Sequence, residues 1–235
     1  MQRQPAIVNH KTVLYGTIIM ADLPDHPTCA APSRREARRE ERREAILEVA
    51  ARYFLEHGYA ATTMSGIAAA LGGSKGTLWN YYASKELLFS DVLERATRDF
   101  KAQLTLALNP DEDVVSVLGA FCSRYLARLT NPQAIALYRL IMGEAGRFPE
   151  IGRAFYEHGP LSVHQLLAGY LDGAMERGDL RRADPFDAAQ YLAALCLARS
   201  HMRTLARCSD VLIPAEAEMD ARAALEVFLR AYAPD

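Results

Sequence analysis

The sequence predicts an all-α protein, in which a small three-helix head precedes a larger helical bundle. Three observations favour this fold class. Long segments repeat apolar residues at the three- and four-residue spacing of an amphipathic helix, and their ends are marked by glycine, proline or capping residues. No segment shows a convincing two-residue alternation of a half-buried strand. The chain of 235 residues is long enough for one small domain and a larger one.

The composition excludes several classes of protein. With a net charge of -2, the whole molecule is not a generic binder of polyanions. The four cysteines form no C-x-x-C pair and no histidine cluster lies near them, so we expect no metal or cofactor and reduced thiols in the cytosol. No run of about 18 apolar residues suggests a membrane span. The apolar segment "TVLYGTIIMA" is too short for export, so we expect a cytoplasmic protein.

Residues 1–33 are expected to be a disordered N-terminal extension, because they hold four prolines and no sustained apolar period. Met20 offers a second start, and we hypothesise that residues 1–19 are an over-extended start.

The first helix of the head is predicted in "SRREARREERREAILEVAARYFLEHGY", which begins at Ser33 and is closed by Gly58 as a C-cap. Its arginine-rich first half is interpreted as a solvated, salt-bridged helix start. The alternative is a basic arm on the DNA backbone, formed by Arg34, Arg35, Arg38 or Arg39.

Two short helices follow, separated by a glycine turn. Thr62 or Thr63 caps the helix in "TTMSGIAAALGG", and Ser74 caps the next, "KGTLWNYY". Such a pair predicts a helix-turn-helix motif within 63–82, whose second helix enters the major groove of DNA. A longer helix, capped by Ser84, runs to about residue 108.

The remaining chain is predicted to be helical, with breaks at prolines and glycines. We therefore divide the chain into a head at 34–100 and a body at 101–235. The helices expected in the body lie near 112–130, 132–145, 149–158, 161–177, 185–207 and 215–232.

The second helix of the motif has one face suited to DNA. On a helical wheel Leu78 and Tyr82 point inward, whereas Gly76 and Asn80 lie opposite and Trp79 flanks them. An asparagine amide can read an adenine edge, and a glycine lets the backbone approach closely. Trp79 is placed to pack on sugar-phosphate or bases, and its alternative is a partly buried surface aromatic.

Charge supports the same interpretation. No acid occurs between Glu56 and Glu86, and a surface that meets phosphates must exclude carboxylates. Lys75 and Lys85 would supply phosphate charge and Tyr81 a hydroxyl contact. For either lysine alone, a solvated side chain is the simpler interpretation.

These segments resemble the N-terminal domain of the TetR family of bacterial transcriptional regulators. The resemblance covers roughly residues 40–100 and rests on "REAILEVAARYFLEHGY" followed by "ATTMSGIAAALGGSKGTLWNYYASKELLFSDVL". It implies a DNA-binding head, and a body that dimerises and usually binds a small ligand. The DNA contacts it implies, with Ser74 added to them, are Thr63, Ser65, Ser74, Lys75, Gly76, Thr77, Trp79, Asn80, Tyr81 and Lys85.

Three positions depart from the family pattern. Ser65 stands where many members carry a longer, often basic side chain, and Gly73 replaces a small apolar turn residue. Asn80 stands where an aromatic residue is common, so the bases it reads cannot be borrowed from relatives.

The body gives a weaker resemblance. Residues 136–160 resemble the C-terminal domain of a subgroup of TetR-like regulators, several of which are associated with efflux control. By family analogy 185–207 and 215–232 would form the dimer. Apolar and aromatic residues of 112–177 suit a hydrophobic ligand, with Arg124 and Gln165 as further polar anchors. The candidate pocket residues are Phe121, Tyr125, Tyr138, Ile141, Phe155, His164 and Tyr170.

Two rival interpretations stay open at this point. An enzyme is disfavoured because His158, His164 and His201 are isolated and no P-loop, G-x-G-x-x-G, H-E-x-x-H or G-x-S-x-G pattern occurs. A helix-turn-helix dimer that binds DNA without any ligand is the other. We expect a homodimeric repressor that a small hydrophobic ligand releases from double-stranded operator DNA.

Overall fold

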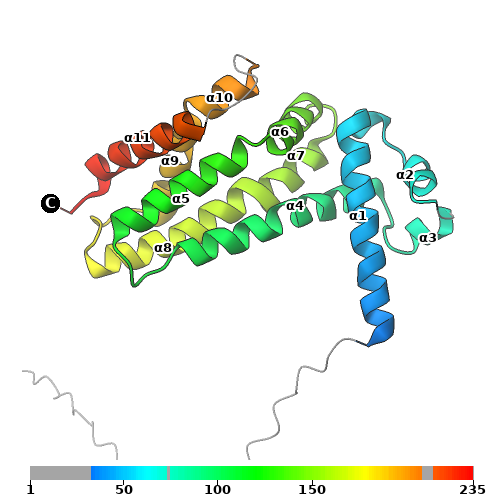
Figure 1. The fold of residues 1–235 in the computed structure, drawn as a ribbon, viewed down its shortest axis with the longest axis horizontal. Coiled ribbons are helices and arrows are strands. Elements are labelled where there is room, and N and C mark those ends of the chain that lie inside the picture. The colour runs from blue at the N-terminus through cyan, green and yellow to red at the C-terminus, as the bar shows by residue number, and fades with distance from the viewer. Residues whose placement is uncertain (1–32, 73–74, 208–213, 235) are drawn as a thin grey trace, which may run out of the picture.

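The computed structural model describes residues 33–72, 75–207 and 214–234, and it confirms the all-α prediction for that part of the chain. Figure 1 shows a head at one end of an elongated body. The head comprises α1 (Arg34–Ala61), α2 (Met64–Ala70) and α3 (Lys75–Trp79). The remaining elements are α4 (Lys85–Ala107), α5 (Val114–Leu129), α6 (Pro132–Glu144), α7 (Pro149–Tyr156), the π-helical turn η1 (Glu157–Leu161), α8 (Ser162–Arg177), α9 (Pro185–Leu197), α10 (Ser200–Leu205) and α11 (Pro214–Tyr232).

Side-chain caps begin most of the head helices where the sequence places them. The Ser33 hydroxyl accepts from Glu36 N–H, and the Glu36 carboxylate accepts from Ser33 N–H in return. The Thr63 hydroxyl accepts the Gly66 N–H at 3.0 Å, which settles the choice between Thr62 and Thr63. Ser84 caps α4 through the Leu87 N–H at 3.3 Å. The predicted cap Ser74 and nearly all of the N-terminal extension lie outside the described residues.

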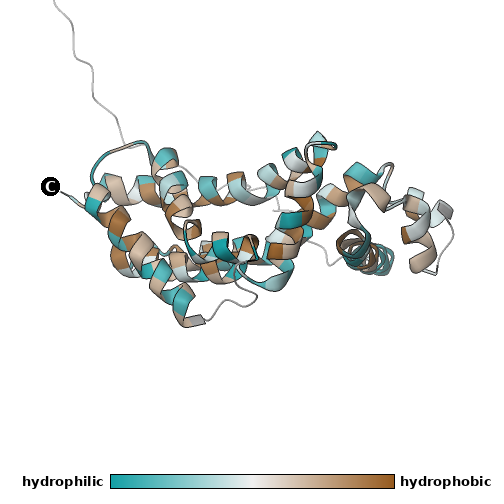
Figure 2. Cartoon of the chain, turned by 90° about the horizontal axis from the view of Figure 1, so that it is seen from above, coloured by the Kyte–Doolittle hydropathy of each residue, from teal (hydrophilic) through white to brown (hydrophobic). Residues whose placement is uncertain are grey.

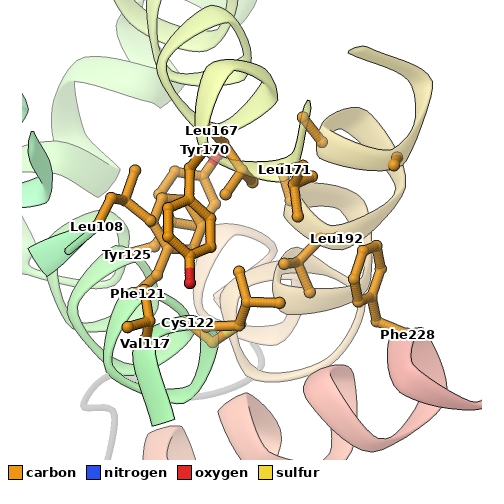
Figure 3. Close-up of a cluster of buried hydrophobic side chains, with 14 of the residues drawn as sticks. Leu108, Val117, Phe121, Cys122, Tyr125, Leu167, Tyr170, Leu171, Leu192 and Phe228 are labelled. Atoms are coloured by element: carbon orange, nitrogen blue, oxygen red, sulfur yellow. The ribbon is translucent and has the colours of Figure 1, made fainter. Parts of the chain in front are cut away.

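One helix, α4, takes part in two hydrophobic cores. Its first half contributes Phe89 and Leu93 to a core shared with α1, α2 and α3. Its second half contributes Phe100 and Leu104 to the core of the body. Figure 3 shows that second core, where side chains from α5, α8, α9 and α11 meet. The predicted division at residue 100 therefore falls inside a continuous helix, close to the point where its packing partners change.

The body helices are amphipathic, as their sequences predict. In the view from above, each carries hydrophilic and hydrophobic residues in alternation along its length (Figure 2). Their packing removes the apolar faces from water, which is the main favourable contribution to folding. Among the residues that the structure describes, no helix has the length and apolarity to cross a bilayer.

A break predicted at Gly159 and Pro160 is wrong. The chain passes from α7 into α8 through η1 and stays helical. Proline has no N–H to donate within a helix, and a widened π turn accommodates that loss. The Ser162 hydroxyl lies 2.9 Å from the carbonyl oxygens of both His158 and Gly159, so its one proton is shared between them.

The single helix expected at 185–207 is also wrong, because the chain leaves the helical conformation at Arg199 and divides it into α9 and α10. A partner from α11 holds the break. The buried carboxylate of Asp220 accepts the Ser200 N–H at 2.9 Å and pairs with the Arg199 guanidinium at 3.3 Å. The cause is a tertiary contact, which local helix propensity does not reveal.

The joint between head and body is a break near the end of α1. Gly58 has φ of +79°, a left-handed conformation that favours glycine, so α1 is interrupted there rather than ended. The two N–H groups freed beyond the break, those of Tyr59 and Ala60, donate to the two carboxylate oxygens of Glu144 at 2.8 and 2.7 Å. Glu144 is the last residue of α6, so one body helix holds the head directly.

Lys85 binds the same short segment, which follows the break. Its ammonium group donates to the carbonyl oxygens of Tyr59 at 2.8 Å and Thr62 at 3.1 Å. It also lies 4.1 Å from the centroid of the Tyr59 ring, a cation–π contact. The start of α4 and the end of α6 are therefore both fastened to the same four residues of α1 and its cap, 59–62.

Replacing Glu144 tests this joint. Glu144→Ala removes the acceptor for two backbone N–H groups, so we expect the free energy of unfolding to fall by about 2 kcal/mol. Urea denaturation followed by circular dichroism measures it. The matched control is Glu226→Ala, which removes a carboxylate from an exposed pair with Arg230 and should cost less than about 0.5 kcal/mol. Equal losses in the two variants would contradict the role of Glu144.

Candidate DNA-binding and ligand-binding sites

The outward face of α3 is the one that the sequence predicts. Leu78 and Tyr82 are only 2% and 5% exposed, whereas Trp79 is 49% exposed. Gly76 and Asn80 are exposed as well, and the helical hydrogen-bond pattern continues past α3, since Asn80 N–H donates to the Gly76 carbonyl at 3.1 Å. The predicted wheel is confirmed, including the exposure of the tryptophan. Contact of these side chains with DNA stays a prediction.

Packing against α1 positions α2. A Cβ at Gly66 would lie 2.6 Å from the Tyr53 hydroxyl, so any larger residue would require the Tyr53 side chain to shift. Two of the predicted DNA contacts, Thr63 and Ser65, are exposed on α2. The hydroxyl of Thr63 already caps the helix, whereas Ser65 presents its hydroxyl to solvent.

The remaining predicted contacts differ in how they are placed. Thr77 and Tyr81 are half-buried, and Tyr81 packs against the core of the head. The ammonium of Lys85, expected on a phosphate, is instead turned to the carbonyls of residues 59 and 62. Ser74 and the side chain of Lys75 lie outside the described residues, so their roles stay predictions.

A cavity of about 460 Å³ lies where the head meets the body. Most of its wall is apolar, and some lining residues, such as Leu55, Gln133 and Ala194, are also exposed at the surface. The lining residues come from α1 (Ala51, Phe54, Leu55), α4 (Phe89, Val92, Ala96, Thr97, Phe100), α5 (Tyr125, Arg128, Leu129), α6 (Gln133, Ala134, Leu137, Tyr138), α7 and η1 (Phe155, Gly159, Pro160), α8 (Val163, His164), α9 (Gln190, Ala193, Ala194, Leu197) and α10 (His201).

Four of the seven predicted pocket residues line this cavity: Tyr125, Tyr138, Phe155 and His164. The other three do not. Phe121 and Tyr170 are packed in the body core, as Figure 3 shows, and Ile141 is fully buried in the core of the head. The predicted anchors Arg124 and Gln165 are exposed and do not line it either.

The cavity-lining residues of α1, α4, α9 and α10 were not predicted from the sequence. Apolar residues such as Phe54, Phe89 and Phe100 carry the same helical spacing as core residues, so nothing local distinguishes them. The lone histidine His201 was the one available signal, because a buried polar side chain needs a partner.

Among the polar side chains that line the cavity, three carry titratable nitrogen groups: His164, His201 and Arg128. The Nδ1 atoms of His164 and His201 are buried without a hydrogen bond in the described part of the chain. Burial lowers the pKa of both rings below the usual value, so both are neutral at pH 7. The third is Arg128, whose guanidinium donates to the Ala96 carbonyl at 2.8 Å. Burial lowers the pKa of Arg128 too, although a guanidinium stays charged at any physiological pH.

Comparison with known proteins places both halves of the chain. Residues 46–92 match the bacterial regulatory proteins of the tetR family, and residues 116–234 match the C-terminal domain of AefR-like transcriptional repressors. The second match alone spans half of the chain. The chain belongs to the TetR family.

Solved structures of TetR-family regulators support this assignment. A TetR-family transcriptional regulator from Mesorhizobium loti is 30% identical, with a TM-score of 0.74, and the match covers 83% of this chain and 98% of that one. The flavonoid-responsive regulator FrrA is 31% identical, with a TM-score of 0.70 and the same coverage. The HTH-type transcriptional regulator YhgD of Bacillus subtilis is 33% identical over 70 residues, which span 30% of this chain and 37% of YhgD. This TetR-family protein is therefore a DNA-binding transcriptional regulator.

Asn80 is the residue we expect to read a base. Asn80→Ala in the TetR-family head should weaken operator binding by about 1–3 kcal/mol and relax one position of the site, because one bidentate base contact is lost. Fluorescence anisotropy with operator and random duplexes measures both affinities. Gln103→Ala, an exposed amide on α4 within the body, is the control. An equal loss on random DNA would mean that Asn80 does not read sequence.

Replacing Lys85 distinguishes a structural role of this side chain from contact with a DNA phosphate. Lys85→Met keeps the length of the side chain but leaves two carbonyls without their donor, so the free energy of unfolding should fall by about 1–3 kcal/mol. The salt dependence of operator binding should stay that of the unsubstituted protein.

The control is Lys101→Met, on the same helix but in the body. A logarithmic salt slope that falls by about one, with stability unchanged, would instead assign Lys85 to a phosphate, as the sequence predicts.

Proposed function

We propose that this regulator is a homodimeric repressor that leaves its operator when a small, mainly apolar ligand fills the cavity. The observation that carries the proposal is the origin of the cavity wall. Eight of its lining residues come from α1 and α4, the two helices that flank the helix-turn-helix motif of α2 and α3. A ligand in the cavity therefore touches the elements that position the head.

The path from ligand to DNA runs through α4. Val92, Ala96 and Phe100 present one face of this helix to the cavity, and Lys85 fastens its first turn to the break in α1. A ligand that displaces α4 would tilt the head with it. In a symmetric dimer two recognition helices must fit successive major grooves, about 34–36 Å apart, so a small tilt suffices to spoil the match.

The lining supports an apolar ligand with a few polar groups, the usual chemistry of small-molecule sites. The AefR-like domain described above is that of transcriptional repressors, which supports repression as the sign of regulation. FrrA is described as flavonoid-responsive, so flavonoids are the first compounds to test on this chain.

The dimer is proposed to form through α9 and α11, the helices expected from the sequence. The small residues of α9, such as Ala189 and Ala193, are buried within the chain and are not free for a partner. The exposed side chains of Tyr191, Met219 and Val227 supply apolar surface on these two helices. Apolar surface of this kind is typical of homodimer interfaces.

A binding role accounts for the histidines that raised the possibility of an enzyme. His158 Nε2 lies 2.9 Å from Ser90 Oγ and joins η1 to α4. His164 and His201 line the cavity. We propose that the protein carries out no catalysis and acts in the cytoplasm, where its operator lies.

Reciprocal binding tests the proposal. A flavonoid that weakens operator binding tenfold must itself bind the DNA-bound dimer tenfold more weakly, which corresponds to about 1.4 kcal/mol of coupling. Calorimetric titration of the protein with and without the palindromic duplex found upstream of its own gene measures both affinities. Ala96→Phe, which narrows the cavity from α4, should weaken flavonoid binding. Equal flavonoid affinities in both titrations would leave a dimer that binds DNA regardless of ligand.

A further inference from the structure

We propose that the ligand is an aromatic anion, whose acidic group pairs with Arg128 while its ring system fills the apolar part of the cavity. This inference rests on the proposed function for the biological role of the cavity, but it concerns the chemistry of the site. It is carried by an arginine that lines the cavity and that has no carboxylate partner among the residues that the structure describes.

Most N–H donors of the Arg128 side chain make no hydrogen bond within the described part of the chain. Of its five N–H groups, one donates to the Ala96 carbonyl, and the Phe100 ring centroid lies 5.9 Å from its Cζ atom. No aspartate or glutamate is among the residues that line the cavity. A half-buried cation that lacks a counter-charge costs free energy, and an anionic ligand removes that cost.

Three other half-buried arginines of the described chain are satisfied from within. Arg43 pairs with Asp91 at 2.7 Å, and Arg95 pairs with Glu44 at 2.7 Å. Arg139 donates from two nitrogens to the last carbonyls of α10. Arg128 differs from these three because it makes one hydrogen bond and borders an open volume.

Further polar groups of the cavity suit a second, neutral group on the ligand. His201 is only 3% exposed, and its Nδ1 atom has no partner in the described chain. The same holds for the buried Nδ1 atom of His164. A hydroxyl or amine on the ligand would satisfy either ring. The cavity of about 460 Å³ is large enough for two or three fused or linked rings.

Two fluorescent probes isolate the contribution of charge. 8-Anilinonaphthalene-1-sulfonate and N-phenyl-1-naphthylamine share their ring system, and only the first carries a sulfonate. Their dissociation constants are measured for the unsubstituted protein, for Arg128→Gln and for Arg124→Gln. Arg124 lies one turn earlier on α5, is exposed and does not line the cavity, so it is the matched control.

We expect the unsubstituted protein to bind the sulfonate at least about tenfold more tightly than the neutral amine, as a charge-assisted contact predicts. Arg128→Gln should remove that preference and change the affinity for the amine less than about twofold, whereas Arg124→Gln should preserve it. Arg128→Lys, which retains the charge, should keep part of the preference and covers the case in which the glutamine variant is unstable.

Three results would overturn the inference: no preference for the sulfonate in the unsubstituted protein, a preference that survives Arg128→Gln, or an equal loss in Arg124→Gln. A parallel titration of operator binding with the sulfonate probe separates the two proposals. Binding that depends on Arg128 but leaves the operator bound supports the anion site and contradicts release by ligand. Release by the neutral amine alone supports the proposed function and contradicts the anion site.

Discussion

The break in α1 at Gly58 is the constraint on which the rest of the structure depends. A helix that stops and restarts exposes N–H and C=O groups that must find partners when they are half-buried. Here Glu144 accepts the N–H groups freed by the break, and Lys85 donates to two carbonyls of the segment that ends α1 just beyond it. The partners come from α6 and α4, so satisfying the backbone of one helix fixes two others against it.

This joint explains why the cavity lies beside the head. Beyond the fastened ends, α4 and α6 both run along the cavity, which is lined by Phe89 and Val92 from α4 and by Leu137 and Tyr138 from α6. Because α4 belongs to both hydrophobic cores, the head and the wall of the cavity share this helix. A packed core does not deform continuously, so displacement of one of these helices moves the joint as a unit.

Local signals predicted the head well and the cavity only in part. Caps such as Thr63 and Ser84, and the inward pair Leu78 and Tyr82, depend on residues within one turn, so the sequence contains the whole argument. The helical period distinguishes side chains that point inward from side chains that point outward. Residues of a core and residues that line a cavity both point inward, so the period does not distinguish them. Phe121 and Tyr125 lie one turn apart on α5, yet only the second reaches the cavity. That difference is decided by helices distant in sequence.

The unmet polar groups are costs of folding that a ligand offsets. In the described part of the chain, the buried Nδ1 atoms of His164 and His201 and the uncompensated charge of Arg128 cost free energy. In the proposed function such a cost is a source of binding energy, because the ligand supplies partners to these groups. It also favours one chemistry over another, since a purely apolar compound of the same size would leave all three groups unpaired. In the proposed function these three side chains therefore favour a particular ligand chemistry, whereas the apolar wall determines mainly the size of the ligand.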